Sequence, residues 1–338
     1  MSEKFVVALI SCVHDVPEWV YNKYKEAGIE FRFHECNTRQ DLQEYASDAD
    51  VLWLMSGRAG LVAKENMDIF KKAGAAIKCG SGTDNIDHDA CTKAGIIVAH
   101  TPEDPVEPTS DHAIALLFTA VRQTARQDRL IRHGIHEPQA ALPIGKFTGE
   151  ELGIIGFGRI GKAIARKLSG FKMNVRVFDP YLDKTLVETM GAQKVELEQL
   201  LRKSKYIIVQ CPLTQETQNL IGRSQLQMMR PDSVLVNNAR AGIVDEKALI
   251  EALKNGWIKA AACDVLGNHD DKELLSLENL NFTPHLGGWP ANYPYDTFAA
   301  VVDQIVAMSK KKKPQWIANP KVKPRWKWCN GSCITAQT

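Results

Sequence analysis

Two polar side chains with distinct chemistry stand at the ends of apolar stretches in this chain. Arg240 follows the apolar residues 233–239, and its forked guanidinium can clamp a carboxylate and polarise a neighbouring carbonyl. His285 ends the stretch 280–285, and an imidazole there suits proton transfer near neutral pH. Each residue also has a simpler interpretation. Arg240 would then be an ordinary solvent-exposed arginine, and His285 a hydrogen-bonded structural histidine. The residues around them have to decide between these interpretations.

The stretch GIIGFGRIGKAIARKL places Gly156, Gly158 and Gly161 in a Gly-x-Gly-x-x-Gly pattern, after an apolar run and at the opening of a helix. In that context the first glycine permits a tight turn and the second lets a pyrophosphate approach the backbone. The third lets the helix pack on the strand, and the helix N-terminus holds the phosphates. We therefore predict a dinucleotide site; the alternative is a glycine-rich turn that serves packing alone.

Asp179 lies eighteen residues after Gly161 (179 − 161), at the end of the next apolar run. A carboxylate at this place accepts hydrogen bonds from the adenosine ribose 2′-hydroxyl and repels a 2′-phosphate. The sequence therefore predicts NAD as the cofactor rather than NADP, although Arg176 nearby favours the opposite choice.

The segment CDVLGNHDD, residues 263–271, passes abruptly from an apolar run into a polar cluster. A catalytic site, a metal site and a plain turn are the alternatives. His269, Asp270 and Asp271, together with His285, offer the side chains of a metal site. Adjacent ligands in a flexible loop rarely set good coordination geometry, so we predict no metal here.

The elements that position these residues follow from the periodicity of the chain. Short apolar runs alternate with helical patterns almost from end to end, which predicts an α/β fold with parallel sheets. The first series of expected strands covers 5–11, 29–35, 51–57, 75–80 and 96–100. The second series covers 152–158, 175–179, 206–212, 233–239, 261–266 and 280–285, which is a complete six-stranded dinucleotide-type sheet.

Two helical patterns join the two series of strands. Apolar residues at helical spacing predict a long helix over 109–131 and a second one over 296–313. We interpret them as the outgoing and returning crossings between two domains, so that one domain is inserted whole into the other. The expected domains are a substrate domain, 1–103 plus 297–338, and an NAD-binding domain, 104–296.

Composition limits the class of protein further. The 338 residues are 44% hydrophobic, and 42 basic against 40 acidic residues leave a net charge of +2, which gives no general attraction to nucleic acid. The sequence has neither signal-peptide features nor a window of ~18 apolar residues that could span a membrane. Eight cysteines scattered among apolar runs predict reduced, buried thiols, and the pair Cys329 and Cys333 lacks companion metal ligands. We expect a cytoplasmic protein with no membrane or nucleic-acid partner.

From about residue 75 to residue 290 the chain resembles the D-isomer-specific 2-hydroxyacid dehydrogenases. The matching stretches, in order, are GTDNIDHDAC, PTSDHAIALL, GIIGFGRIG, CPLTQETQNLIG, VNNARAGIVDEKALIEAL and NFTPHLGG. The resemblance implies two Rossmann-like or flavodoxin-like domains, usually in a homodimer, that move a hydride between NAD and C2 of a small D-2-hydroxy acid or its 2-keto acid. The alternative is a non-catalytic, NAD(H)-responsive binding or corepressor-like protein on the same fold.

The resemblance also implies residue roles at the matching motifs. Arg240 would bind the substrate carboxylate and carbonyl, and His285 would exchange the proton of the C2 oxygen. Backbone N–H groups at Ser81 and Gly82 would hold the carboxylate. Trp289 departs from the family pattern, because relatives commonly have smaller or polar residues there; it could shape the substrate pocket, close the cleft between the domains or pack against the returning helix. The expected cofactor-binding residues are Thr109, Gly156, Gly158, Arg159, Ile160, Gly161, Asp179, Cys211, Pro212, Ala239, Asp264, His285 and Gly287.

One position departs from the family pattern. The usual glutamate falls 29 positions after Arg240, where this chain has His269. In the usual arrangement that carboxylate pairs with the catalytic histidine and raises its pKa. His269 could orient His285, whereas a protonated His269 would depress its pKa; Asp270 or Asp271 restores a carboxylate if the loop shifts. The missing acid supports the non-catalytic alternative, and the retained Arg240 and His285 argue against it.

Overall fold

The computed structural model describes residues 4–12, 15–55, 58–141, 143–268 and 270–332. The chain separates into two compact units. Unit 1 contains the residues up to Pro105 and those from Trp289 onward, and unit 2 contains Val106–Gly288. The division expected from the sequence lay at 103/104 and 296/297.

Unit 1 is built on a five-stranded parallel sheet with the order β2-β1-β3-β4-β5, which is the flavodoxin-like order. Its strands are β1 (Phe5–Ser11), β2 (Ile29–Phe33), β3 (Val51–Leu54), β4 (Ala75–Lys78) and β5 (Ile97–His100). Its helices are α1 (Glu18–Glu26), α2 (Arg39–Tyr45), η1 (Lys64–Asn66), α3 (His88–Lys93) and α12 (Tyr295–Ser309), and a small ribbon pairs β13 (Lys312–Lys313) with β14 (Cys329–Ser332).

Alternate residues of β1 supply the two cores of unit 1, because successive side chains of a strand point to opposite faces. Val7 and Leu9 pack with α1 and α12, and Val6 and Ala8 pack with α2 and α3. On α12 the fully buried Phe298 lies edge-on to Trp53 of β3, with ring centroids 5.5 Å apart. The C-terminal segment thus completes the core that the N-terminal residues begin.

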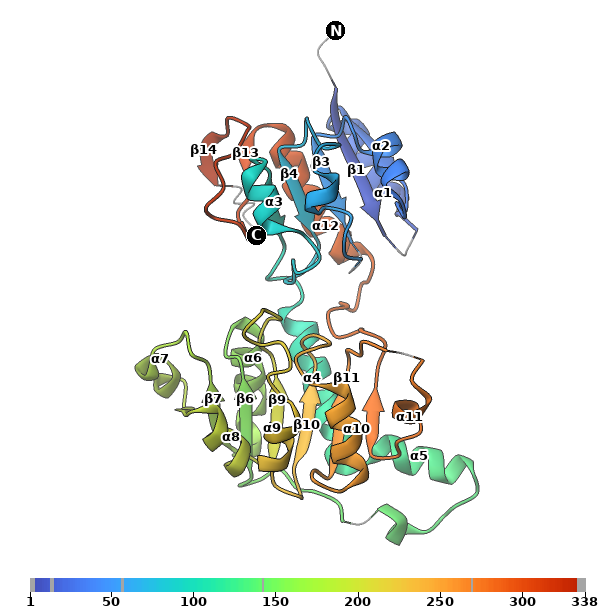
Figure 1. Ribbon diagram of the computed structural model, residues 1–338, viewed down its shortest axis with the longest axis vertical. Helices are drawn as coiled ribbons and strands as arrows, with labels where there is room; N and C mark the ends of the chain where they lie inside the picture. The colour runs from blue at the N-terminus through green and yellow to red at the C-terminus, as the bar shows by residue number, and fades with distance from the viewer. Residues whose placement is uncertain (1–3, 13–14, 56–57, 142, 269, 333–338) are drawn as a thin grey trace. The chain divides into compact units, whose positions relative to one another are not determined.

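Unit 2 is built on a seven-stranded parallel sheet with the order β12-β11-β10-β9-β6-β7-β8 (Figure 1). Its strands are β6 (Glu151–Ile155), β7 (Asn174–Phe178), β8 (Gln193–Lys194), β9 (Tyr206–Val209), β10 (Val234–Asn237), β11 (Ala260–Cys263) and β12 (Leu280–Phe282). If β6 is numbered strand 1 and the sheet is read from β8, the first six strands have the order 3-2-1-4-5-6, which is the dinucleotide-binding arrangement. Its topological switch point lies between β6 and β9. The strand β8 is not among the predicted strands, because its two residues are too few to show a period.

Helices cover both faces of this sheet (Figure 1). The helices of unit 2 are α4 (Val106–Arg122), α5 (Thr124–Arg132), η2 (Pro138–Ala141), α6 (Arg159–Leu168), η3 (Ser169–Phe171), α7 (Lys184–Thr189), α8 (Leu197–Lys203), α9 (Arg223–Met228), α10 (Glu246–Lys254) and α11 (Lys272–Leu275), of which α5 and η2 extend away from the sheet (Figure 1). In β9, Tyr206 and Ile208 pack with α4 and α6, whereas Ile207 and Val209 pack with α8, α9 and α10. A strand buried on both faces explains the continuous apolar run read from the sequence.

The predicted fold class is confirmed, since both units are α/β with parallel sheets. The predicted helix 109–131 is wrong in two respects: the helix begins at Val106, and it is broken at Gln123, whose φ of 54° is left-handed. The expected helix 296–313 ends at Ser309 instead. Most predicted strands end two or three residues too late, because their last polar or glycine residues leave the ladder and form the turns beyond it.

Two findings concern partners and redox state. Among the described residues, no helix is both long and apolar enough to cross a membrane. The seven cysteines in the described part of the chain are free thiols, of which Cys12, Cys36, Cys91, Cys211 and Cys263 are buried.

Candidate active site

The glycine turn joins β6 to α6 at the switch point of unit 2. Gly156 has a φ of 91°, and a Cβ built on it would lie 2.6 Å from the backbone nitrogen of Cys211 on the neighbouring strand connection. A Cβ on Gly161 would collide with the carbonyl oxygen of Gly156. Gly158, by contrast, starts α6 with open space where its Cβ would be. The turn is therefore closed toward the protein and open at the helix N-terminus, which fits a bound pyrophosphate.

Asp179 follows β7 and folds back onto this turn. Its carboxylate accepts hydrogen bonds from the backbone N–H of Phe157, at 2.9 Å, and of Tyr181, at 3.0 Å. Arg176 forms an ion pair with Glu151, the first residue of β6. Because parallel strands run in one direction, that pair draws the guanidinium toward the amino end of the sheet and away from Asp179.

Other predicted cofactor residues surround the same turn. Arg159 is exposed and Ile160 half-buried at the start of α6, and Cys211 and Pro212 follow β9. Burial raises the pKa of the Cys211 thiol to about 11, so at neutral pH it adds no negative charge beside the turn. The electrostatic setting thus stays compatible with a bound phosphate.

Arg240 lies three residues beyond the end of β10. The side-chain amide of Asn237 donates to the carbonyl of Arg240 at 3.0 Å, and its amide oxygen accepts from the N–H of Ala239 at 3.2 Å. The Arg240 guanidinium donates to the carbonyl of Ala239 at 2.8 Å. Asn237 therefore closes the turn that carries Arg240 off the edge of the sheet.

Asp264, the residue after β11, is the centre of a hydrogen-bonded hub that holds the loop after β12. Its carboxylate is almost fully buried and accepts from the backbone N–H groups of Leu286, at 2.9 Å, and Gly287, at 2.8 Å. It also accepts from the hydroxyl of Thr283 and lies 3.2 Å from Nε2 of His112. Burial raises the pKa of Asp264, but the hydrogen bonds from His112, Thr283 and the two backbone groups outweigh it and hold the pKa below its usual value. The carboxylate is therefore ionised at neutral pH.

This hub fixes the backbone of His285. The N–H of His285 donates to the carbonyl of Asp264 at 2.8 Å and to that of Thr283 at 3.0 Å. Its φ of 59° is left-handed, a conformation that costs a residue with a Cβ about 1–2 kcal/mol. Because the residues on both sides are bonded to Asp264, the turn is over-determined and fixes the backbone position from which the side chain of this exposed residue projects.

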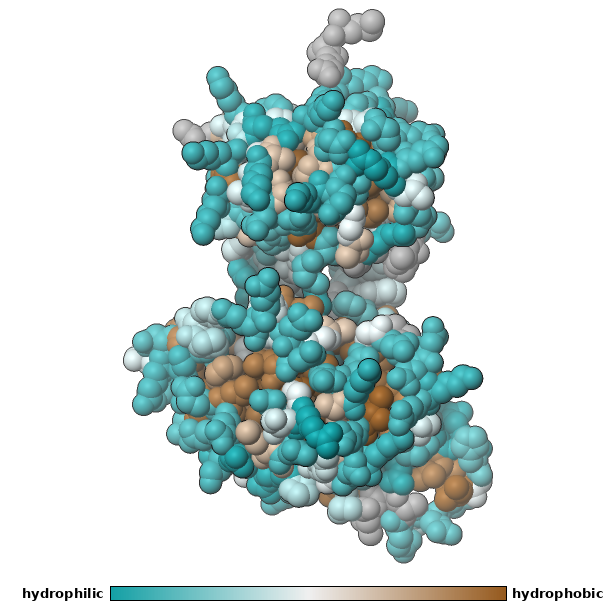
Figure 2. Space-filling model, in the orientation of Figure 1, coloured by the Kyte–Doolittle hydropathy of each residue, from teal (hydrophilic) through white to brown (hydrophobic). Residues whose placement is uncertain are grey.

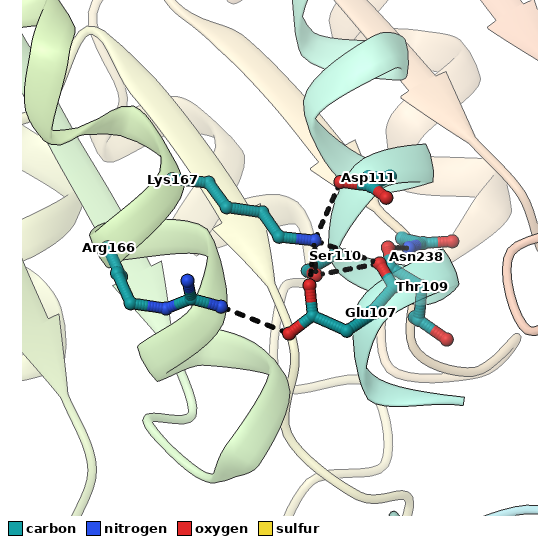
Figure 3. A network of polar contacts seen from close by, with 7 residues as sticks. All are labelled: Glu107, Thr109, Ser110, Asp111, Arg166, Lys167 and Asn238. Carbon is teal, nitrogen blue, oxygen red and sulfur yellow. Dashed lines mark hydrogen bonds and ion pairs between the residues drawn. The ribbon is translucent and has the colours of Figure 1, made fainter. Parts of the chain in front are cut away.

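The first turn of α4 is anchored to α6 (Figure 3). Lys167 on α6 donates to Ser110 Oγ at 2.7 Å and pairs with the carboxylates of Glu107, at 2.8 Å, and Asp111, at 2.6 Å. The side chain of Asn238 donates to the carbonyl of Thr109 at 2.8 Å. Thr109, a predicted cofactor residue, is thus held on one side by Asn238, the residue after β10, while α6 holds the turn around it.

The predicted substrate residues Ser81, Gly82 and Trp289 belong to unit 1. The Ser81 hydroxyl donates to the carbonyl of Pro102 at 3.3 Å, in a turn preceded by Gly80 with a φ of 84°. Trp289 stacks on Tyr293 with centroids 4.2 Å apart and planes 9° apart, and 42% of its surface is exposed. The structure thus brings the glycine turn, Arg240 and His285 together on the carboxyl edge of one sheet in unit 2, whereas the predicted substrate residues Ser81, Gly82 and Trp289 lie in unit 1.

Comparison with known proteins identifies the family. Residues 114–287 match the family described as D-isomer specific 2-hydroxyacid dehydrogenase, NAD binding domain. Over 295 residues the chain is 35% identical to the glyoxylate reductase of Pyrococcus furiosus, covering 84% of this chain and 86% of that relative. The chain belongs to the D-isomer specific 2-hydroxyacid dehydrogenase family.

Further relatives agree with this assignment. A D-3-phosphoglycerate dehydrogenase of Methanocaldococcus jannaschii is 33% identical over 285 residues, which are 83% of this chain and 54% of that relative, so the chain spans about half the length of that protein. The crystal structure of a glyoxylate reductase from Paecilomyes thermophila has a TM-score of 0.81 at 26% identity, covering 91% of this chain and 96% of that one. An NADPH-dependent glyoxylate/hydroxypyruvate reductase from Sinorhizobium meliloti, in complex with NADP and malonate, has a TM-score of 0.81 at 25% identity, covering 97% and 100%.

The comparisons confirm the predicted resemblance and the class of enzyme. They also confirm a nicotinamide dinucleotide as the cofactor of the family, without distinguishing NAD from NADP. The matched residues fall inside unit 2, where the glycine turn lies.

The loop that carries the departure from the dehydrogenase pattern is described in part. His269 lies outside the described residues, so its orienting role stays a prediction. Asp271 caps α11, accepting from the N–H of Glu273 at 2.9 Å and of Leu274 at 3.2 Å, which gives this carboxylate a structural task. In the described part of the chain, no three His, Cys, Asp or Glu side chains cluster as metal ligands would.

His112 is the residue of this dehydrogenase site that sequence reasoning missed. It stands in the middle of an amphipathic helix, and its contact with Thr283 spans 171 residues of sequence. The stretch PTSDHAIALL contains it, but no local pattern distinguishes a histidine that meets the site from one that faces solvent.

Gly287→Ala tests the packing of the hub. A Cβ there would lie 2.6 Å from Oδ1 of Asn238 and 2.9 Å from Oδ2 of Asp264, so we expect a loss of about 1–3 kcal/mol in the free energy of unfolding, measured by urea denaturation. Gly170→Ala is the matched control, because a Cβ at Gly170 meets nothing within 4 Å. Equal stability of the two variants would contradict this description of the hub.

Proposed function

We propose that this protein is an NAD-dependent oxidoreductase that interconverts a small D-2-hydroxy acid and its 2-keto acid by hydride transfer. The observation that supports the proposal is the loop after β12 in unit 2, which hydrogen bonds to Asp264 hold in place. A buried, ionised Asp264 holds His285 in a left-handed backbone conformation at the sheet edge that also carries Arg240 and the glycine turn. A non-catalytic binding protein has no need of this strained backbone at His285. The relatives of this chain are also named as reductases and dehydrogenases.

In the proposed reaction each residue acts at a stated atom of the substrate. Arg240 binds the carboxylate and polarises the C2 carbonyl through its forked donors. His285 gives its proton to the C2 oxygen during reduction and removes it during oxidation. The nicotinamide supplies or accepts the hydride when the cofactor is bound. Unit 1 is the proposed substrate domain, in which the N–H groups of Ser81 and Gly82 hold the carboxylate and Trp289 shapes the pocket.

Unit 2 is the proposed NAD-binding domain. Gly156, Gly158 and Gly161, with Arg159 and Ile160, would cradle the pyrophosphate, and Asp179 would accept from the ribose 2′-hydroxyl. The ion pair of Arg176 with Glu151 supports NAD over NADP, because that arginine is already engaged. The proposed contacts at the nicotinamide end are Thr109, Ala239, Asp264, His285 and Gly287, and Cys211 and Pro212 line the turn.

The first test is the loss of NADH absorbance with glyoxylate, hydroxypyruvate, pyruvate and bulkier 2-keto acids. We expect turnover with at least one of them, and His285→Asn to lower kcat by about 10²–10⁴-fold with NADH binding retained. Arg240→Lys should raise KM for the keto acid, because an ammonium cannot form the fork. No turnover with any of these keto acids, with NADH binding confirmed, would favour the non-catalytic alternative.

The role of His269 is tested by His269→Ala. An unchanged pH–rate profile and an unchanged kcat/KM in this variant would remove the orienting role of His269.

Asp179→Asn tests the choice of cofactor. We expect kcat/KM for NADH to fall by about tenfold, which corresponds to about 1.4 kcal/mol, while the value for NADPH does not fall. Neutralising the exposed Glu188 of α7 as Glu188→Gln is the control and should leave both values unchanged. Equal use of NADPH and NADH by the unaltered protein would contradict the role given to Asp179.

We further propose a cytoplasmic homodimer assembled through α5. This helix has no buried residue, and Figure 2 shows a hydrophobic area on the surface in the region of α5. The exposed apolar residues there are Ile131 on α5, 55% exposed, and Ile135 just after it, 42% exposed. A second copy of the chain would cover such a patch.

Light scattering coupled to size exclusion tests the dimer. The unaltered protein should have about twice its chain mass of 37.6 kDa, and Ile131→Asp should shift it toward the monomer. Leu186→Asp, on the exposed face of α7, should leave the mass unchanged. A monomeric unaltered protein would refute the assembly.

A further inference from the structure

His112 connects a rigid helix of unit 2 to the loop that carries His285. It lies on α4, next to Ala113, which is fully buried in the core beneath the sheet. Its Nε2 lies 2.9 Å from Oγ1 of Thr283 and 3.2 Å from Oδ1 of Asp264. The side chain is only 23% exposed, so water competes little for these contacts.

The hydrogen count in this cluster assigns the direction of each bond. A carboxylate can only accept, and a threonine hydroxyl has one proton to donate. The Thr283 hydroxyl donates that proton to Asp264 Oδ1. Nε2 of His112 must therefore carry a hydrogen, because both oxygens that face it can only accept from it. This assigns His112 the tautomer with a protonated Nε2.

The cluster reaches His285 by two short routes. The carbonyl of Thr283 and the carbonyl of Asp264 both accept the N–H of His285, at 3.0 Å and 2.8 Å. Beyond His285 the carboxylate of Asp264 holds the next two backbone N–H groups. A shift of either Thr283 or Asp264 would therefore move the imidazole.

The other end of the connection is fixed as well. The apolar stripe of α4 is buried against the sheet, and its first turn is held by Lys167 and Asn238 (Figure 3). His112 thus transmits the position of a rigid helix to a loop whose strained conformation has to be maintained.

We propose that His112 is a positioning residue that holds His285 in place for proton transfer, acting through Thr283 and Asp264. The inference rests on the proposed function of His285 and adds a residue from a distant element to that site. His112 touches neither substrate nor reacting atoms in this role. Its contribution is the placement of the group that does.

Three variants test the role by kinetics with the best 2-keto acid. His112→Leu removes the donor, and we expect kcat to fall by about 10–100-fold, as a displaced catalytic group would cause. KM for the keto acid and the Kd of NADH, from fluorescence titration, should change by less than about twofold, because Arg240 and the glycine turn are untouched. His112→Gln offers an amide N–H in place of Nε2–H and should restore most of kcat. Thr283→Val removes the intermediate hydroxyl and should resemble His112→Leu.

The pair of sites supplies a second, internal test. If His112 acts through Thr283, the double variant should be little slower than the slower single variant. His34→Leu is the matched control, because His34 stacks on Tyr45 in unit 1, with centroids 3.8 Å apart, and lies outside the proposed site. Its kcat should equal that of the unaltered protein. Multiplicative losses in the double variant, or an unchanged kcat in His112→Leu, would overturn the proposal.

Proton–nitrogen correlation spectra of ¹⁵N-histidine-labelled protein give a readout that does not depend on turnover. We expect the His112 signals, assigned by their loss in His112→Gln, to show a protonated Nε2. The His285 ring signals should shift in His112→Leu and stay in place in His34→Leu. A His112 protonated on Nδ1 alone, or unmoved His285 signals, would refute the inference.

The two failures are distinguishable. If the unaltered protein reduces no keto acid, the proposed function fails and the spectra alone decide whether His112 positions His285. If it turns over and His112→Leu is as fast, the function stands and the positioning role fails. Should His112→Leu not fold, Thr283→Val and His112→Gln carry the same comparison.

Discussion

The buried carboxylate of Asp264 is the interaction on which the candidate site depends. An ionised group removed from water is costly unless hydrogen bonds replace its hydration. Here the side chains of Thr283 and His112 and two backbone N–H groups replace it, and the pKa of the carboxyl stays below its usual value. The same bonds hold the backbone from Thr283 to Gly287, so the groups that stabilise the charge also fix the conformation of the loop.

The parallel sheet of unit 2 explains why these residues meet at all. All seven strands run in one direction, so the connections after β6, β9, β10, β11 and β12 emerge at the same edge. The switch point between β6 and β9 leaves the glycine turn facing a neighbouring strand connection, and Gly156 fits against the backbone of Cys211 only because it lacks a side chain. The rest of the site follows from the order of the strands.

The sequence predicted elements better than their ends. Hydrophobic periodicity located all eleven predicted strands within three residues at each end, but it extended them into Gly156, Asp179 and the residues after Asn237. Those residues are outside the ladders because their backbones turn toward the site, and a turn is decided by neighbours rather than by apolar character. The break of the long helix at Gln123 had no signal in composition either, since glutamine is a good helix former.

The sequence by itself determined the family, the two parallel-sheet α/β units, and the residue types available for chemistry. These properties reside in local patterns, such as the glycine spacing, the acid after the next strand, and Arg240 and His285 at strand ends. Only the tertiary structure decided how those residues are held. The left-handed backbone of His285, the hub at Asp264 and the contact of His112 with Thr283 join segments up to 171 residues apart. Such contacts depend on the order of strands in the sheet, which no local pattern specifies.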